Sequence, residues 1–148
     1  MSELHPAAMS GTSAEEPRSD LAALGVPQRR RLPDTRPSIT HKFNINGYEG
    51  YISVGLFEDG RPGEVFLKMA KEGSTVSGLM DTIGVLTSLA LQYGVSVETL
   101  AAKFEGTHFE PMGWTSNSNL REVTSIADYI FRWLRSEFLS TNHDSQHS

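Results

Sequence analysis

The stretch that decides the fold runs from residue 63 to residue 95, GEVFLKMAKEGSTVSGLMDTIGVLTSLALQYGV. Its start alternates, with Val65, Leu67 and Met69 on one side, which is the pattern of a half-buried strand. After a short loop, Ser74 is placed to cap a helix that apolar residues at helical spacing extend to residue 93. The polar residues of this helix form one narrow strip: Ser77, Asp81, Ser88 and Gln92. We therefore predict a mostly buried helix at the centre of the core.

Two glycines interrupt this predicted helix, Gly78 and Gly84. Each lowers helix stability by about 1 kcal/mol relative to alanine. Their presence indicates that the helix backbone approaches a sheet closely. Gly94 follows the last periodic residue, where a glycine commonly ends a helix.

Two more strands precede this stretch. Residues 38–45 alternate between apolar and polar side chains, and residues 48–57 form a return strand. Asn46-Gly47 lies between them and predicts a two-residue hairpin turn, because both residues tolerate a positive φ. A turn at Glu58-Asp59-Gly60 then leads into the third strand. These signals predict three antiparallel strands in a meander.

The C-terminal part of the chain predicts two further helices. Ser96 caps a short helix over residues 97–104, which Gly106 ends. A longer helix is expected over residues 121–139, with Asp128 four residues before Arg132 as a favourable ion pair. The predicted fold class is therefore α+β: a three-stranded antiparallel meander packed on a central buried helix, with a short second helix and a long C-terminal helix.

The 148 residues are enough for one ordinary domain. Residues 1–37 carry five prolines and no periodic apolar face, so we expect a disordered arm and basic linker. The domain is expected over residues 38–139, followed by a disordered polar tail over residues 140–148. No leader segment is predicted at the N-terminus, and the polar residues within 75–93 argue against a membrane span. A cytoplasmic location is expected.

Composition excludes several function classes. The net charge of −5 argues against a nucleic-acid binder that works by neutralising phosphates. The chain has no cysteine, which excludes a disulfide scaffold, a thiolate metal site, a thiol nucleophile and a thiyl radical. His41 and His108 are far apart in sequence and have no carboxylate or second histidine at ligand spacing, and His143 and His147 lie in the predicted polar tail. No nucleophile, base and orienting group occur together. We expect no metal site and no catalytic residue.

Residues 71–75 are a candidate anion or nucleotide site. Lys71, Gly73, Ser74 and Thr75 lead from a strand into a helix start, where free amides and the helix dipole suit an anion. The order of residues differs from that of a nucleotide P-loop. The alternative interpretation is an ordinary capped helix start.

Two other stretches are candidate partner surfaces. Phe109, Met112 and Trp114 lie in an irregular segment with Pro111, and aromatic and methionine side chains are enriched where proteins meet. The alternative is a loop that packs over the core. The basic run of Arg29, Arg30 and Arg31 is either a solvated linker or an electrostatic dock for an acidic partner or a phosphate.

A resemblance to a known family extends from about Arg29 to Leu139. It rests on the hairpin, the EDG turn, FLKMAKEGST, LALQYGV, KFEGTHFEPMGW and DYIFRWL, which occur in that order. In these motifs the chain resembles the C-terminal region of bacterial adenosylcobalamin-dependent (class II) ribonucleotide reductases, which belongs to the TSCPD domain family.

The resemblance implies an accessory or regulatory domain that acts in deoxyribonucleotide supply through contact with a reductase catalytic chain. The resembled enzymes use adenosylcobalamin and cysteine chemistry, whereas this chain has no cysteine. We therefore expect that it binds no cofactor and does not reduce ribonucleotides on its own. The alternative function is a small nucleotide- or anion-binding module at residues 71–75. A chain that starts with Met suggests a stand-alone product, although an excised fragment would look the same.

Overall fold

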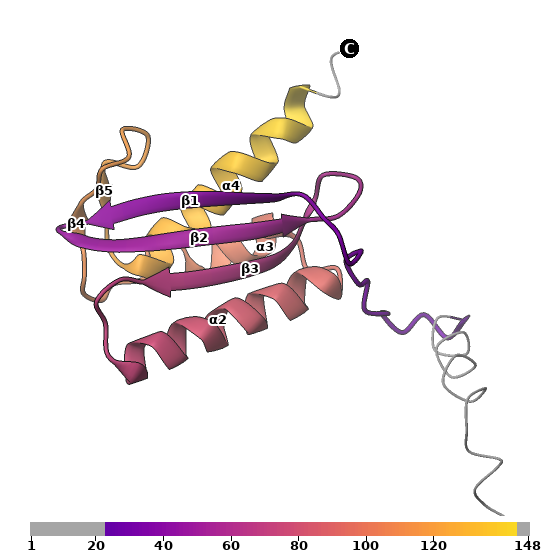
Figure 1. The fold of residues 1–148 in the computed structure, drawn as a ribbon. Coiled ribbons are helices and arrows are strands. Elements are labelled where there is room, and N and C mark those ends of the chain that lie inside the picture. The colour runs from indigo at the N-terminus through magenta and orange to yellow at the C-terminus, as the bar shows by residue number, and fades with distance from the viewer. Residues whose placement is uncertain (1–22, 145–148) are drawn as a thin grey trace, which may run out of the picture.

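The computed structural model describes residues 23–144, with side chains placed through residue 139 (Figure 1). Strands β1 (Ser38–Ile45), β2 (Tyr48–Leu56) and β3 (Pro62–Met69) form an antiparallel sheet in the order β1-β2-β3. Helices α2 (Ser74–Gln92) and α3 (Val97–Phe104) come next. The short strands β4 (Gly113–Trp114) and β5 (Glu122–Val123) then precede α4 (Ile126–Asp144). The predicted α+β class and the meander are confirmed.

The hairpin turn between β1 and β2 is the predicted one. Asn46 and Gly47 have φ values of 49° and 90°, the positive values that this turn requires. Beside the turn, the segment after β4 pairs with the end of β1, because Asn46 N donates to Trp114 O at 2.8 Å and Ser116 N donates to Asn44 O at 3.1 Å. This pairing covers the free edge of β1 at that end of the sheet.

The central helix of the core is α4 rather than α2. Tyr129, Ile130 and Leu134 of α4 are at most 2% exposed, and the Tyr129 ring stacks on Phe43 of β1 with centroids 4.8 Å apart. Figure 1 shows α4 behind the sheet, with α3 beside it. α4 thus covers the apolar face of the meander.

Helix α2 runs along the outer edge of β3 (Figure 1). The Ser88 hydroxyl accepts a hydrogen bond from Val65 N at 2.8 Å, and Gln92 Nε2 donates to Gly63 O at 2.9 Å. A Cβ at Gly84 would lie 2.8 Å from Val65 O, so the backbones of helix and strand are in close contact there. α2 therefore satisfies peptide groups that an edge strand would otherwise expose.

The prediction that α2 is mostly buried was wrong. Leu79, Val85 and Leu86 are 58%, 59% and 61% exposed. The physical reason is that Ser88 and Gln92, assigned to the outward polar strip, face the strand edge and leave large aliphatic residues outside. The close approach to a sheet is confirmed at Gly84, but no atom lies within 4 Å of a Cβ placed at Gly78.

The exposed apolar residues of α2 also bear on whether this helix could cross a membrane. By length and composition alone α2 is apolar enough to cross a membrane, with a mean hydropathy of 1.3, contrary to the expectation from its polar residues. One such helix is weak evidence for a membrane span, because core helices of soluble proteins meet the same criterion. The packing of α2 along β3 accounts for part of its apolar surface and leaves the outward residues unexplained.

Some predicted helix ends are correct and others are shifted. Ser96 caps α3 by accepting from Thr99 N at 3.0 Å, and Gly94 ends α2 with a φ of 94°. The N-cap of α2 is Gly73 rather than Ser74, and it makes no side-chain cap. α4 begins at residue 126 rather than 121, because residues 122–123 pair with β4, and it extends through residue 144 into the predicted tail. Residues 145–148 lie outside the described residues.

Contacts with the domain begin before the predicted boundary at Ser38. Arg36 donates from Nε and Nη2 to Glu64 at 2.6 and 2.9 Å, and Leu56 N donates to Pro37 O at 2.9 Å. Arg30 N also donates to Gln92 O at 2.8 Å. Residues 29–37 therefore pack on the domain, while residues 1–22 of the predicted arm lie outside the described residues.

Candidate functional site

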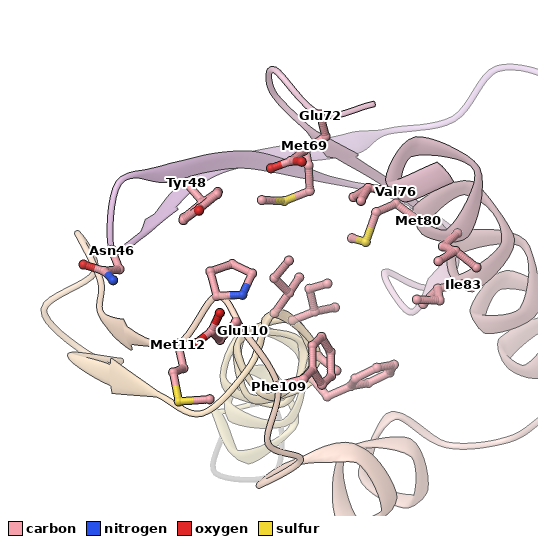
Figure 2. Close-up of a pocket in the computed structure, with 16 residues that line it drawn as sticks. Asn46, Tyr48, Met69, Glu72, Val76, Met80, Ile83, Phe109, Glu110 and Met112 are labelled. Atoms are coloured by element: carbon pink, nitrogen blue, oxygen red, sulfur yellow. The ribbon is translucent and has the colours of Figure 1, made fainter. Parts of the chain in front are cut away.

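A groove of about 710 Å³ lies between the first half of α2, the start of α4 and the loop at residues 109–112 (Figure 2). The β1–β2 turn and the end of β3 close its other side, through Asn46, Tyr48 and Met69. Its volume falls within the range of about 300–1,000 Å³ that is typical of small-molecule pockets. These five parts of the fold together build the groove.

The floor of the groove is apolar and well packed. Met69, Met80 and Ile130 are 4%, 5% and 2% exposed. The rim also carries large apolar side chains, but these are open to solvent, with Phe109 at 46% and Met112 at 38% exposed. Such a surface is suited to contact with an apolar ligand or partner.

The polar side chains of the groove are few and all lack partners. They belong to Asn46, Tyr48, Glu72 and Glu110. Within residues 23–139, whose side chains the structure describes, none of these side chains makes a hydrogen bond or an ion pair. Among the residues that the structure describes, no lysine, arginine or histidine lines the groove. The charge at the groove is therefore negative, and its carboxylates are free to accept hydrogen bonds.

Asp128 and Ser125 hold the segment that carries the 109–112 loop. Gly106 N and Thr124 N donate to the two carboxylate oxygens of Asp128 at 2.8 and 3.0 Å, and Phe109 N donates to Thr124 O at 3.0 Å. Burial acts to raise the pKa of Asp128, but these amide donors and Arg132 outweigh it and lower the pKa. The carboxylate is thus a structural anchor, and the predicted Asp128–Arg132 ion pair is confirmed at 3.3 Å.

The predicted anion site lies beside the groove. Lys71 has a left-handed φ of 60°, and Gly73, Ser74 and Thr75 are exposed at the start of α2. The first turn of α2 has no acidic residue and no side-chain cap. Its amides are consequently available to an anion, and the site remains a prediction. The neighbouring residue Glu72 lines the groove instead.

The predicted aromatic partner surface is exposed. Phe109 and Met112 form part of the groove rim, whereas Trp114 lies outside the lining and is 67% exposed. At this exposure the Trp114 side chain does not pack over the core. Its role in an interface remains a prediction.

The basic run is divided by the fold. Arg29 Nε donates to Gln92 Oε1 at 2.6 Å, and the Arg30 guanidinium contacts Asp59 at 3.0 Å and lies 4.0 Å from the centroid of the Phe57 ring. Of the three, only the Arg31 side chain has no partner within residues 23–139. These arginines lie near the β2–β3 turn, at the opposite end of the sheet from the groove. The structure therefore does not bring them together with the aromatic surface.

The part of the chain that the structure describes contains no group of three or more His, Asp or Glu residues that could hold a metal ion. His41 is half-buried and stacks on Trp133 with centroids 4.7 Å apart, and its Nε2 lies 2.8 Å from the Tyr129 hydroxyl. Burial lowers the pKa of His41, with Glu137 opposing the shift. Asn117 Nδ2 donates to the same hydroxyl at 3.2 Å, so this cluster is a closed structural network.

Most groove residues were absent from the sequence-based candidates. The sequence predicts only Phe109 and Met112 of these residues as partner-binding. Met69 and Met80 follow the spacing of buried strand and helix residues, so nothing in the sequence distinguishes them from the rest of the core. The sequence does contain a signal for the residues that hold the 109–112 loop in place: Ser125 and Asp128 have the spacing of a capping box at a helix start. Ser125 Oγ accepts from Asp128 N at 2.9 Å, and recognition of this cap would have located the start of α4.

The chain is similar to one family of domains and to one kind of enzyme. Residues 25–138 match the family described as TSCPD domain. The vitamin B12-dependent ribonucleotide reductase of Rhodopirellula baltica is 59% identical over 116 residues, which cover 78% of this chain and 11% of that protein. The enzyme of the same name from Streptomyces avermitilis is 49% identical over 113 residues, covering 76% and 12%.

A further relative with that name, from Agrobacterium fabrum, is 40% identical over 121 residues, covering 81% of this chain and 9% of its own length. No solved structure matches. The chain thus spans about a tenth of the length of these curated relatives.

Proposed function

Because the chain belongs to the TSCPD domain family, we propose that it is an accessory or regulatory domain that acts with a vitamin B12-dependent ribonucleotide reductase. In this proposal it works in the cytoplasm, in the supply of deoxyribonucleotides for DNA synthesis. It acts through contact with the reductase catalytic chain and performs no reduction itself, since it has no cysteine.

One observation carries the proposal: a 59%-identical segment occurs within a reductase, of which it makes up 11%. The apolar surface supports it. Soluble monomers rarely expose large contiguous apolar patches, and such patches commonly mark contact sites. Here Leu79 and Leu86 of α2 and Phe109 at the groove rim are each 46–61% exposed.

The cofactor named for the relatives does not suit the groove. Cobalamin carries an anionic phosphate and is a large ligand, whereas the groove has two carboxylates and no basic side chain. No histidine lines it that could serve as an axial ligand to cobalt. We therefore assign adenosylcobalamin to the catalytic chain of the relatives.

Binding in trans tests the proposal. The R. baltica reductase without its matching segment would be mixed with the full 148-residue chain, and association followed by sedimentation velocity. We expect a complex and altered deoxynucleotide formation. If the truncated reductase remains active but neither binds nor responds to the chain, the accessory role is wrong. Formation of deoxynucleotides by the chain alone with adenosylcobalamin and a dithiol would contradict the absence of catalysis.

A second candidate function is the binding of a nucleotide or other anion at residues 71–75. The open, uncapped start of α2 beside Lys71 favours it. Titration with phosphate and with dATP, followed by amide chemical shifts, tests it. Shifts are expected at Gly73, Ser74 and Thr75, and shifts confined to other loops would exclude this site.

A further inference from the structure

We propose that the groove receives a polypeptide segment of the reductase catalytic chain in which an arginine or lysine lies beside apolar side chains. This inference rests on the proposed function and names the surface and the chemistry of the contact. The groove in Figure 2 is lined from several directions by apolar side chains, with carboxylates at its border.

The apolar part of the occupant follows from the groove lining. Three methionines, Met69, Met80 and Met112, come from β3, α2 and the 109–112 loop and meet in this one groove. Met112 is 38% exposed at the rim, whereas Met69 and Met80 form the buried floor. Methionine is unbranched and polarisable, so a groove lined by it adapts to partners of different shape. Phe109 adds an aromatic side chain at the rim. Aliphatic or aromatic anchors of a partner would bury this surface.

The basic part of the occupant follows from charge. Glu72 and Glu110 are the charged groups of the groove among the described residues, and neither has a partner within residues 23–139. The nearest basic residue in sequence, Lys71, does not line the groove. Carboxylates at the border of an apolar site favour a cation and oppose a phosphate. The same observation separates this groove from the anion site proposed at the start of α2.

The polypeptide nature of the occupant follows from the extent of the apolar surface. Leu79 lines the groove, and Leu86 lies seven residues later on the same side of α2, about 10 Å further along the helix axis. Both are more than half exposed. A small molecule held in the groove would leave Leu86 uncovered, whereas a peptide segment continuing along α2 would cover both.

Methionine methyl NMR provides the test. The full-length chain, labelled at its methionine methyls, is titrated with short overlapping peptides that tile the R. baltica reductase outside its matching segment. Three of the five methionines line the groove, and Met1 and Met9 lie outside the described residues and serve as references. We expect the three groove methyls to shift, and the peptides that shift them to combine apolar residues with an arginine or lysine.

Matched variants locate the contact. Leu79→Lys and Glu110→Lys should weaken binding of the selected peptide by about tenfold or more. Val85→Lys and Glu58→Lys introduce the same changes at exposed positions outside the groove and should alter affinity by less than about twofold. Equal effects of all four variants would refute the groove as the site.

The remaining outcomes separate the two proposals. Binding of the truncated reductase without any shift of the groove methyls removes this inference and leaves the accessory role intact. If the truncated reductase does not bind, the accessory role fails and the peptides still decide the groove. Methyl shifts that depend on the concentration of the chain alone would make the occupant a second copy and overturn the inference, as would selection of peptides without a basic residue.

Discussion

Replacing Gly84 by alanine tests the contact between α2 and β3 most directly. In an ordinary helix this change would stabilise the protein by about 1 kcal/mol, because glycine is the weaker helix former. Here the added Cβ would lie 2.8 Å from Val65 O. Real Cβ atoms do not approach other atoms so closely, and a backbone oxygen cannot rotate away. The helix must therefore move away from the strand.

The cost of that movement follows from the contacts it disturbs. Overpacking a tight interface typically costs about 1–3 kcal/mol. The hydrogen bond from Val65 N to Ser88 Oγ, 2.8 Å long, would also lengthen, with a loss of about 1 kcal/mol. After the gain in helix propensity is subtracted, Gly84→Ala should lower the free energy of unfolding by about 1–3 kcal/mol.

Gly78→Ala is the matched control, since it makes the same change in the same helix where no atom lies within 4 Å. It should raise the free energy of unfolding by about 0.5–1 kcal/mol. Urea unfolding followed by circular dichroism measures both, provided that the m-value stays constant. If the two variants shift stability in the same direction and by similar amounts, α2 does not lie against the backbone of β3 and the reasoning is refuted.

Three further predictions concern other parts of the domain. Burial lowers the pKa of His41, so as the pH falls the unfolded chain protonates His41 before the folded chain does, and stability should decrease below about pH 6.5. His41→Phe should flatten that part of a plot of urea midpoint against pH. An unchanged slope would contradict this prediction. A chain beginning at Ser38 loses the Arg36–Glu64 contact and the hydrogen bond from Leu56 N to Pro37 O, and should have a lower urea midpoint than one beginning at residue 23; equal urea midpoints would show that residues 23–37 do not stabilise the domain. Trp114→Ala should change the free energy of unfolding by less than about 0.5 kcal/mol, and a loss above about 2 kcal/mol would place this side chain in the core.

The sheet could be predicted from the sequence because its signals are local. Alternation of apolar residues follows from the geometry of a strand, and Asn46-Gly47 suits a turn whose φ values are positive at both positions. The same holds for the cap at Ser96, where a single side chain satisfies a nearby amide. Each of these features depends on a few neighbouring residues and not on the rest of the fold.

The orientation of α2 could not be predicted in this way. Helical periodicity shows which residues share a face, but not what that face contacts. A sheet edge presents peptide N–H and C=O groups, and these take polar side chains such as Ser88 and Gln92. The polar strip therefore faces inward and the leucines face outward. The groove was also beyond prediction, because its lining comes from parts of the chain that no short motif connects.

Whether the outward face of α2 alone could hold a partner depends on the free energy of burying its leucines compared with the free-energy cost of association. Full burial of a leucine is worth about 1.5–3 kcal/mol. Leu79 and Leu86 are 58% and 61% exposed, so covering them yields roughly 1–2 kcal/mol each. Association costs about 4–15 kcal/mol in lost freedom of motion. The two leucines therefore cannot hold a free partner, and the groove must supply most of the contact.

Covalent attachment changes this comparison. In the R. baltica reductase the matching segment lies in the same chain as the rest of the enzyme, of which it makes up 11%. A linker replaces the cost of association by an effective concentration, which can raise apparent affinity by about 10²–10⁴. We therefore expect higher occupancy of the groove when this chain is fused to the truncated reductase than when the two are mixed as separate chains. Methionine methyl shifts of the fused and unfused proteins, compared at equal concentration, measure the difference; identical shifts would show that the contact does not depend on a tether.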